Sequence, residues 1–162
     1  MTLTLNPFAI SGLLLVLTCS FLTLLILIYG RTKLHRVWAL FNVAVGIWGL
    51  GAVLVGMTTT EQWGVINWRI AHIGVIFIAV FFFHVICVFC EIPRRKFIIF
   101  AYLQGIFFLV LDSTNLFISR TKFMFNSLYY TQSSGLFYPI FFLIWLSLVL
   151  WGHIELYKFF RM

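Results

Sequence analysis

Residues 70–90 read IAHIGVIFIAVFFFHVICVFC and contain no Asp, Glu, Lys or Arg. A helix needs about 20 mostly apolar residues to cross the hydrocarbon layer of a bilayer, so this run predicts a transmembrane helix. A second run without such charges, residues 9–29, reads AISGLLLVLTCSFLTLLILIY and predicts another. Together the two runs indicate that the chain folds in a membrane.

The composition of the whole chain agrees with a membrane environment. Hydrophobic residues make up 63% of the 162 residues and charged residues only 9%, and the mean hydropathy is +1.09. A soluble domain of this length needs a more polar surface. We therefore predict an all-α integral membrane helical bundle that forms a single domain over residues 1–162, with no soluble domain.

Five membrane spans are expected. The fourth is the shortest, and because Gln104 and Gly105 interrupt it, its full crossing stays open. Residues 113–135 form one long connection rich in aromatic side chains, which favour the headgroup level. Two interpretations of this connection stay open, a functional loop and a disordered or lipid-resting loop. The spans are about 9–30, 37–57, 69–90, 96–112 and 136–157.

The Lys and Arg residues lie in the short gaps between apolar runs, unlike the polar basic face of a nucleic-acid-binding domain. Loops on the cytoplasmic side carry an excess of Lys and Arg. This excess predicts an outside N-terminus, an external 113–135 loop and a cytoplasmic C-terminus, in a multi-pass protein of the bacterial inner membrane. One side receives eight basic residues and the other three: Arg31, Lys33, Arg36, Arg94, Arg95, Lys96, Lys158 and Arg161 against Arg69, Arg120 and Lys122.

The second span carries small residues at helical spacing. Small residues let two helix backbones approach closely in a membrane, so a packing role is preferred to a functional one. The residues expected to serve it are Gly46, Gly49, Ala52 and Gly56.

Polar side chains at membrane depth are costly and are therefore candidate sites. Arg69 and His72 share one face at the outer end of the third span, where an anionic ligand or a lipid phosphate could bind. The alternative is interfacial anchoring beside Trp63 and Trp68. Deeper in the membrane the expected polar groups are Asn42, His84 and Gln104.

Catalysis, metal binding and cofactor binding are not expected. His84 and Cys87 lie on one helical stripe, but a transition-metal or haem site needs more convergent ligands than the other helices offer. The sequence has no nucleophile-and-base pattern, phosphate-binding glycine loop or paired intramembrane carboxylates. We therefore expect a protein that is not an enzyme and has neither a metal nor a cofactor.

Several motifs resemble the seven-helix N-terminal membrane region of bacterial sensor histidine kinases. They are Phe41-Asn42 with residues 46–50 (GIWGL), residues 68–74 (WRIAHIG) leading to residues 81–84, Thr114-Asn115, and residues 135–138 (GLFY). The resemblance covers most of the chain and corresponds to the first five helices of that region. It leaves open a fragment or a shortened stand-alone relative, since the family continues with two more helices and cytoplasmic kinase modules.

The resemblance implies a sensory input domain that passes a ligand or membrane signal to a cytoplasmic kinase module or partner chain. A ligand site near Arg69, His72, Thr114 and Asn115 is our preferred hypothesis, membrane lipid is an expected partner, and a homodimer stays open. Two other classes remain as alternatives. They are a small transporter or channel subunit, and a membrane assembly factor that acts through helix contacts.

Overall fold

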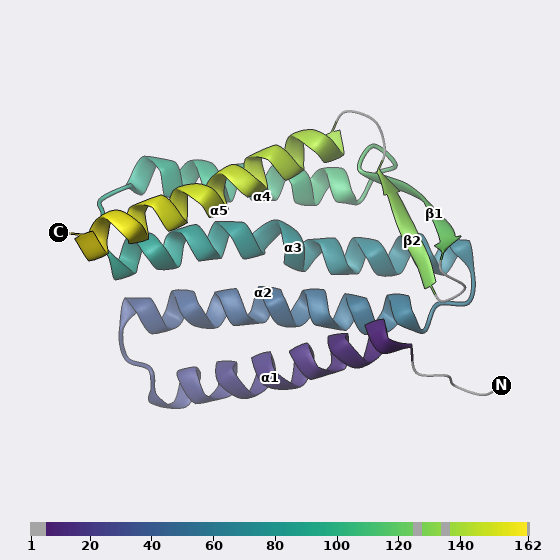
Figure 1. Ribbon diagram of the computed structural model, residues 1–162, viewed down its shortest axis with the longest axis horizontal. Coiled ribbons are helices and arrows are strands. Elements are labelled where there is room, and N and C mark those ends of the chain that lie inside the picture. The colour runs from purple at the N-terminus through teal and green to yellow at the C-terminus, as the bar shows by residue number, and fades with distance from the viewer. Residues whose placement is uncertain (1–5, 125–127, 134–136, 162) are drawn as a thin grey trace.

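The computed structural model describes residues 6–124, 128–133 and 137–161. Within these ranges the chain is mostly helical, as Figure 1 shows. The elements in chain order are α1 (Pro7–Tyr29), α2 (Lys33–Gly56), α3 (Glu61–Phe89), α4 (Arg95–Asp112), β1 (Ile118–Met124), β2 (Leu128–Ser133) and α5 (Phe137–Arg161).

Four of the described helices, α1, α2, α3 and α5, are long and apolar enough to cross a membrane. This supports a multi-pass membrane protein. The predicted span 96–112 corresponds to α4, which has 18 residues. It is not among those four, because Arg95, Lys96 and Asp112 lie within its short length. Length and composition therefore support four of the five predicted spans.

The helices are arranged around α3. In Figure 1, α1, α2 and α3 lie side by side in a row, and α4 and α5 lie on the other side of α3. The α1–α2 turn, the α3–α4 turn and the end of α5 meet at one end of the molecule, which we call the basic end. The β-strands lie at the opposite end, the hairpin end. Successive helices are antiparallel, as short turns require.

Helix α3 begins earlier than the predicted span 69–90. Its first residue is Glu61, because the Thr60 side chain caps the helix by accepting a hydrogen bond from the Trp63 amide. With 29 residues and a rise of 1.5 Å per residue, α3 is about 43 Å long and exceeds a hydrocarbon layer of about 30 Å. The first turns of α3, from Glu61 on, therefore extend beyond the hydrocarbon layer at the hairpin end, and we call them the platform.

The helical architecture agrees with the predicted all-α bundle, and within the predicted loop 113–135 the structure adds a β-hairpin that the sequence did not predict. Strands β1 and β2 are antiparallel, with Thr121 opposite Thr131. Both threonines are buried, and the Thr121 hydroxyl donates a hydrogen bond of 3.1 Å to the Glu61 carbonyl on α3. Residues 125–127 and 134–136 lie outside the described part, and with them the Gly135-Leu136 motif and the first residue of the predicted span 136–157.

The hairpin packs on α3 at Gly64, a position without a side chain. A Cβ added at Gly64 would lie 2.7 Å from Thr121 Oγ1 and 3.1 Å from Tyr129 Cβ. The Trp68 indole also donates a 2.7 Å hydrogen bond to the Tyr129 carbonyl. The strands are thus held against the first two turns of α3 by close packing and by two hydrogen bonds.

Close backbone packing joins α1 to α2. A Cβ added at Gly49 would lie 2.9 Å from the Gly12 carbonyl oxygen, and one at Gly56 would lie 2.7 Å from Ala9 Cβ. A Cβ added at Gly12 would lie 2.9 Å from Ala52 Cβ. Gly46 is less crowded, because a Cβ added there would lie 3.5 Å from Cys19 Cβ. The four residues predicted to serve packing, Gly46, Gly49, Ala52 and Gly56, therefore face α1 of the same chain.

The same kind of packing joins α2 to α3. A Cβ added at Gly51 would lie 2.4 Å from Ala71, and one at Gly74 would lie 2.4 Å from the Ala44 carbonyl oxygen. We call the contacts through Gly12, Gly49, Gly51, Gly56 and Gly74 the glycine seam.

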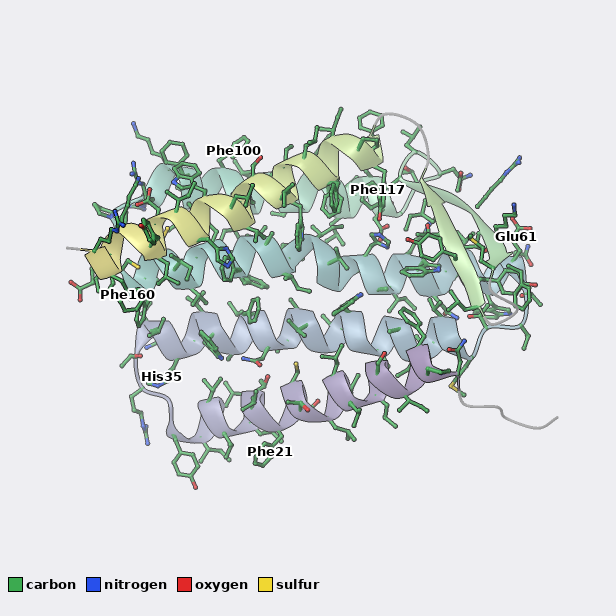
Figure 2. The ribbon with its side chains drawn as sticks, in the orientation of Figure 1. Phe21, His35, Glu61, Phe100, Phe117 and Phe160 are labelled. Atoms are coloured by element: carbon green, nitrogen blue, oxygen red, sulfur yellow. The ribbon has the colours of Figure 1, made fainter. Side chains whose placement is uncertain are left out.

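Large apolar side chains cover the outer surface of the bundle. Phe21 on α1 and Phe100 on α4 point away from the other helices in Figure 2, with exposed fractions of 62% and 58%. Such a surface is stable against lipid and costly against water.

Candidate functional site

Arg69 lies in α3 at the hairpin end. Its guanidinium binds oxygens of the segment that follows α4. One terminal nitrogen donates to the Ser113 carbonyl at 3.3 Å. The other is within hydrogen-bond distance of the Thr114 carbonyl (3.1 Å), Asn115 Oδ1 (2.9 Å) and the Ile118 carbonyl (3.0 Å). Because arginine has a rigid fork of donors, this one side chain fixes the path from α4 into the hairpin.

Thr114 contributes its backbone, not its hydroxyl, to Arg69. The hydroxyl donates to the Leu111 carbonyl at 2.7 Å and accepts from the Leu116 amide at 3.2 Å. These bonds end α4 in a tight turn. Arg69, Thr114 and Asn115 thus lie together, as the sequence suggested. Arg69 and Asn115 contribute side chains to the contact, and Thr114 contributes its carbonyl.

His72 lies one turn further along α3 and is buried, with an exposed fraction of 3%. Its Nδ1 is 2.8 Å from the Trp68 carbonyl and its Nε2 is 3.2 Å from the Tyr138 hydroxyl. The Phe117 and Tyr138 rings pack edge-on against the imidazole, each with a centroid distance of 5.6 Å. Both ring nitrogens therefore have partners, and the imidazole links α3 to the first turn of α5.

Asp112 ends α4 beside this region and is also 3% exposed. Its Oδ1 has no hydrogen-bond partner, and neither has the Nε of Arg69. Burial raises the pKa of this carboxyl group to about 7, and the positive charge of Arg69 opposes the rise. A buried polar atom without a partner costs about 1–3 kcal/mol, so the local hydrogen bonding is incomplete.

These residues form what we call the hairpin-end cluster: Arg69, His72, Asp112, Asn115 and Tyr138. The cluster draws on α3, the end of α4, the connection to β1, and α5. The two terminal nitrogens of Arg69 are already bound to protein oxygens. An anion that entered would have to displace a loop carbonyl, and doing so would release the hairpin connection from α3.

The predicted midplane groups do not gather at one site. The Asn42 amide donates to the Trp38 carbonyl of its own helix at 2.9 Å, and Gln104 donates to the Ala101 carbonyl at 3.0 Å. His84 Nδ1 is 2.9 Å from the Tyr102 hydroxyl on α4. Each group has at least one hydrogen-bond partner close by, as buried polar groups in a membrane require.

Two members of the hairpin-end cluster were not identified as site residues from the sequence. Asp112 and Tyr138 lie at opposite ends of the 113–135 connection, so only the fold shows that they meet. One signal was available for Asp112, an acidic residue directly at the end of an apolar run. No comparable signal marks Tyr138, since aromatic residues are common at membrane interfaces.

Comparisons with protein-family models, with curated proteins and with solved structures found no match to this chain. In the described ranges, no group of three or more His, Cys, Asp or Glu side chains is arranged to hold a metal ion. The hairpin-end cluster and the sequence motifs are therefore the features of this chain that bear on its function.

Proposed function

We propose that the chain is a non-catalytic sensory input domain of the bacterial cell membrane that passes a change of helix packing to a cytoplasmic histidine kinase module. The observation that carries the proposal is the hairpin-end cluster, in which α3 binds the connection after α4 through Arg69 and the start of α5 through His72, while Asp112 at the end of α4 has an oxygen without a partner. A sensor needs two packings whose equilibrium a stimulus can shift.

The Arg69 side chain has a second possible arrangement in the cluster, at a small cost in free energy. Arg69 binds the connection after α4, while Asp112 Oδ1 and Arg69 Nε lack partners nearby. Moving the guanidinium from the loop carbonyls to Asp112 would satisfy the carboxylate and free the connection to β1. An Arg–carboxylate pair adds the attraction of two opposite charges, which the present bonds of Arg69 to neutral oxygens lack. The two arrangements are the two states of the proposed switch.

Helix α5 can transmit the change. Its 25 residues correspond to about 37 Å at 1.5 Å per residue, which reaches from the hairpin end to the basic end. Tyr138 contacts His72 near its start, and Glu155 pairs with Arg94 at 3.4 Å near its end. In the middle, the Trp145 indole donates to the Val75 carbonyl of α3 at 2.9 Å. A movement of Tyr138 therefore displaces the start of α5, and the other contacts carry this displacement along the helix.

The glycine seam lowers the support for the alternative of an assembly factor. That alternative relied on small residues of α2 being free to receive a partner helix. Gly49, Ala52 and Gly56 instead face α1, and Gly51 faces α3.

The test joins a histidine kinase module through a helical linker to the end of α5 and measures its phosphorylation in cells. Asp112→Asn removes the charge that would draw Arg69 away, and so favours the present arrangement. Arg69→Lys loses the fork of donors that holds the loop, and so favours the other. A bias of about 1.4 kcal/mol changes the ratio of the two states tenfold, so the basal phosphorylation of the two variants should move in opposite directions.

Phe21→Leu is the matched control, because Phe21 faces outward from α1. It should leave phosphorylation at the parent level, with all variants present in the membrane in equal amounts. Equal phosphorylation of all the proteins would show that the domain is a passive anchor. The fusion also tests the orientation, since the module can use cytoplasmic ATP only if the basic end faces the cytoplasm.

A further inference from the structure

A second polar region lies at the basic end, apart from the hairpin-end cluster. It is a pocket of about 390 Å³ between the start of α2, the end of α3 and the start of α4. This volume lies within the range of small-ligand sites. The residues that line it are Lys33, His84, Ile92, Pro93, Arg94, Arg95, Ile98 and Ile99.

The charge of this pocket is strongly positive. Three of its lining residues are Lys or Arg, and no acidic residue is among them. The two ion pairs of the described residues both use Glu155, whose partners are Arg94 at 3.4 Å and Lys158 at 3.7 Å. Lys33 and Arg95 take part in neither. Two cations thus face the same pocket without a described carboxylate to neutralise them.

Two further polar groups of the pocket each have a nitrogen without a described partner. His84 uses Nδ1 for the Tyr102 hydroxyl, which leaves Nε2 for a ligand. The buried Nε of Arg94 has no hydrogen-bond partner. At the adjoining start of α4, no side chain caps the helix. Uncapped helix N-termini favour anions, so these groups add to the attraction that Lys33 and Arg95 exert.

The apolar residues of the pocket indicate what kind of anion fits. Ile92, Ile98 and Ile99 form its other wall, and Ile99 continues into the exposed apolar face of α4 that includes Phe100. A ligand with a charged head and a hydrocarbon chain could satisfy both walls at once. Basic pockets between helices at the end of a membrane domain suit the headgroups of anionic lipids.

We propose that this pocket binds the phosphate group of an anionic phospholipid, with Lys33 and Arg95 as its main cationic contacts. Arg94 borders the pocket and also pairs with Glu155 of α5, so the bound lipid lies next to the contact that holds the end of α5. The proposal concerns lipid binding itself and stands whether or not the chain serves a kinase.

The experiment measures phosphatidylglycerol bound to the purified chain by native mass spectrometry, with phosphatidylcholine as the neutral comparison. The double variant Lys33→Gln with Arg95→Gln should weaken phosphatidylglycerol binding by about 30-fold, since each basic residue near a charged membrane surface contributes a factor of about five. The matched control is Lys158→Gln with Arg161→Gln, which removes the same charge from the same end outside the pocket. It should retain parent-level binding.

Inorganic phosphate distinguishes the two sources of the phosphate group. Failure of millimolar phosphate to displace phosphatidylglycerol supports a lipid site. Displacement by phosphate, together with phosphate binding that the pocket variant loses, would identify a soluble phosphate site and overturn the assignment to lipid. Equal loss of phosphatidylglycerol in both double variants, or equal binding of phosphatidylcholine, would show that the pocket has no specific role.

Discussion

The two sides of α3 are packed by different means. Toward α1 and α2 the contacts run through the glycine seam, where backbones meet almost without side chains between them. On the side of α4, α5 and the hairpin, α3 packs against a cluster of large rings that includes Phe108, Phe117, Tyr138 and Phe141. These rings contact one another with centroid distances of 5.2–6.1 Å. We call this second set the aromatic side.

The difference shows where the molecule can change shape. Backbone-to-backbone packing leaves no room for a shift, because any displacement brings peptide groups into contact. Rings that meet edge-on can tilt or slide at a smaller cost. The incompletely satisfied hydrogen bonds of Asp112 and Arg69 lie on the aromatic side. The glycine seam therefore serves as the fixed frame, and the aromatic side holds the adjustable parts.

The largest effect is expected in the glycine seam. Gly74→Ala places a Cβ 2.4 Å from the Ala44 carbonyl oxygen and 2.5 Å from the Trp48 amide nitrogen, so two helix backbones must separate. We expect a loss of about 3 kcal/mol or more in the free energy of unfolding, measured by denaturation in detergent micelles. Gly105→Ala on the aromatic side meets only the Phe77 and Val80 side chains, at 3.3 and 3.4 Å, and should cost about 1 kcal/mol or less. Equal losses would remove the proposed contrast.

A moderate effect is expected where the hairpin docks. Trp68→Phe keeps an aromatic ring but removes the 2.7 Å hydrogen bond to the Tyr129 carbonyl, which leaves a partly buried acceptor without its donor. We expect a loss of about 1–3 kcal/mol, seen as faster amide hydrogen exchange in β1 and β2 with α1 unchanged. Trp63→Phe is the control, because Trp63 is 59% exposed on the same helix. Faster exchange throughout α1 as well would mean that the two sides of α3 unfold together.

The smallest effect is expected at the end of α5. Lys158 lies 3.7 Å from Glu155 with its side chain 60% exposed, so solvent screens the attraction. Lys158→Gln should change the free energy of unfolding by about 0.5 kcal/mol or less, in the same detergent assay. A loss above about 1 kcal/mol would show that this end of the aromatic side depends on charge more than on ring packing.

The helices could be predicted from the sequence because apolar runs such as residues 70–90 are set by the bilayer itself. Their limits were less accurate for a physical reason. The platform that begins at Glu61 is stabilised by the cap at Thr60 and by the docked hairpin, so it extends beyond the hydrophobic run. Hydropathy alone does not detect such an extension.

The hairpin was not predicted, because its residues fit another structure equally well. Its strand-forming residues, including Thr121, Phe123, Tyr129 and Tyr130, also match an aromatic interfacial loop. The decisive contacts of this segment are with Trp68 and Glu61, about 60 residues earlier in the chain, and no local pattern encodes them.

The site was predicted only in part, because some of its contacts also join residues far apart in the sequence. Arg69, His72 and Asn115 carry visible polar groups, whereas the approach of Asp112 and Tyr138 depends on tertiary structure.

The central position of α3 has a consequence for how the protein is made. As the chain leaves the ribosome, α2 can pack on α1, α3 on α2, and α4 and α5 on α3, so each new helix finds its main neighbour already in the membrane. The hairpin differs, because its strands are synthesised after α4 and must turn back to the start of α3. Docking of this segment is therefore a late step of biogenesis. A nascent chain that stalls before residue 133 would have a helical frame without the cover over its hairpin end.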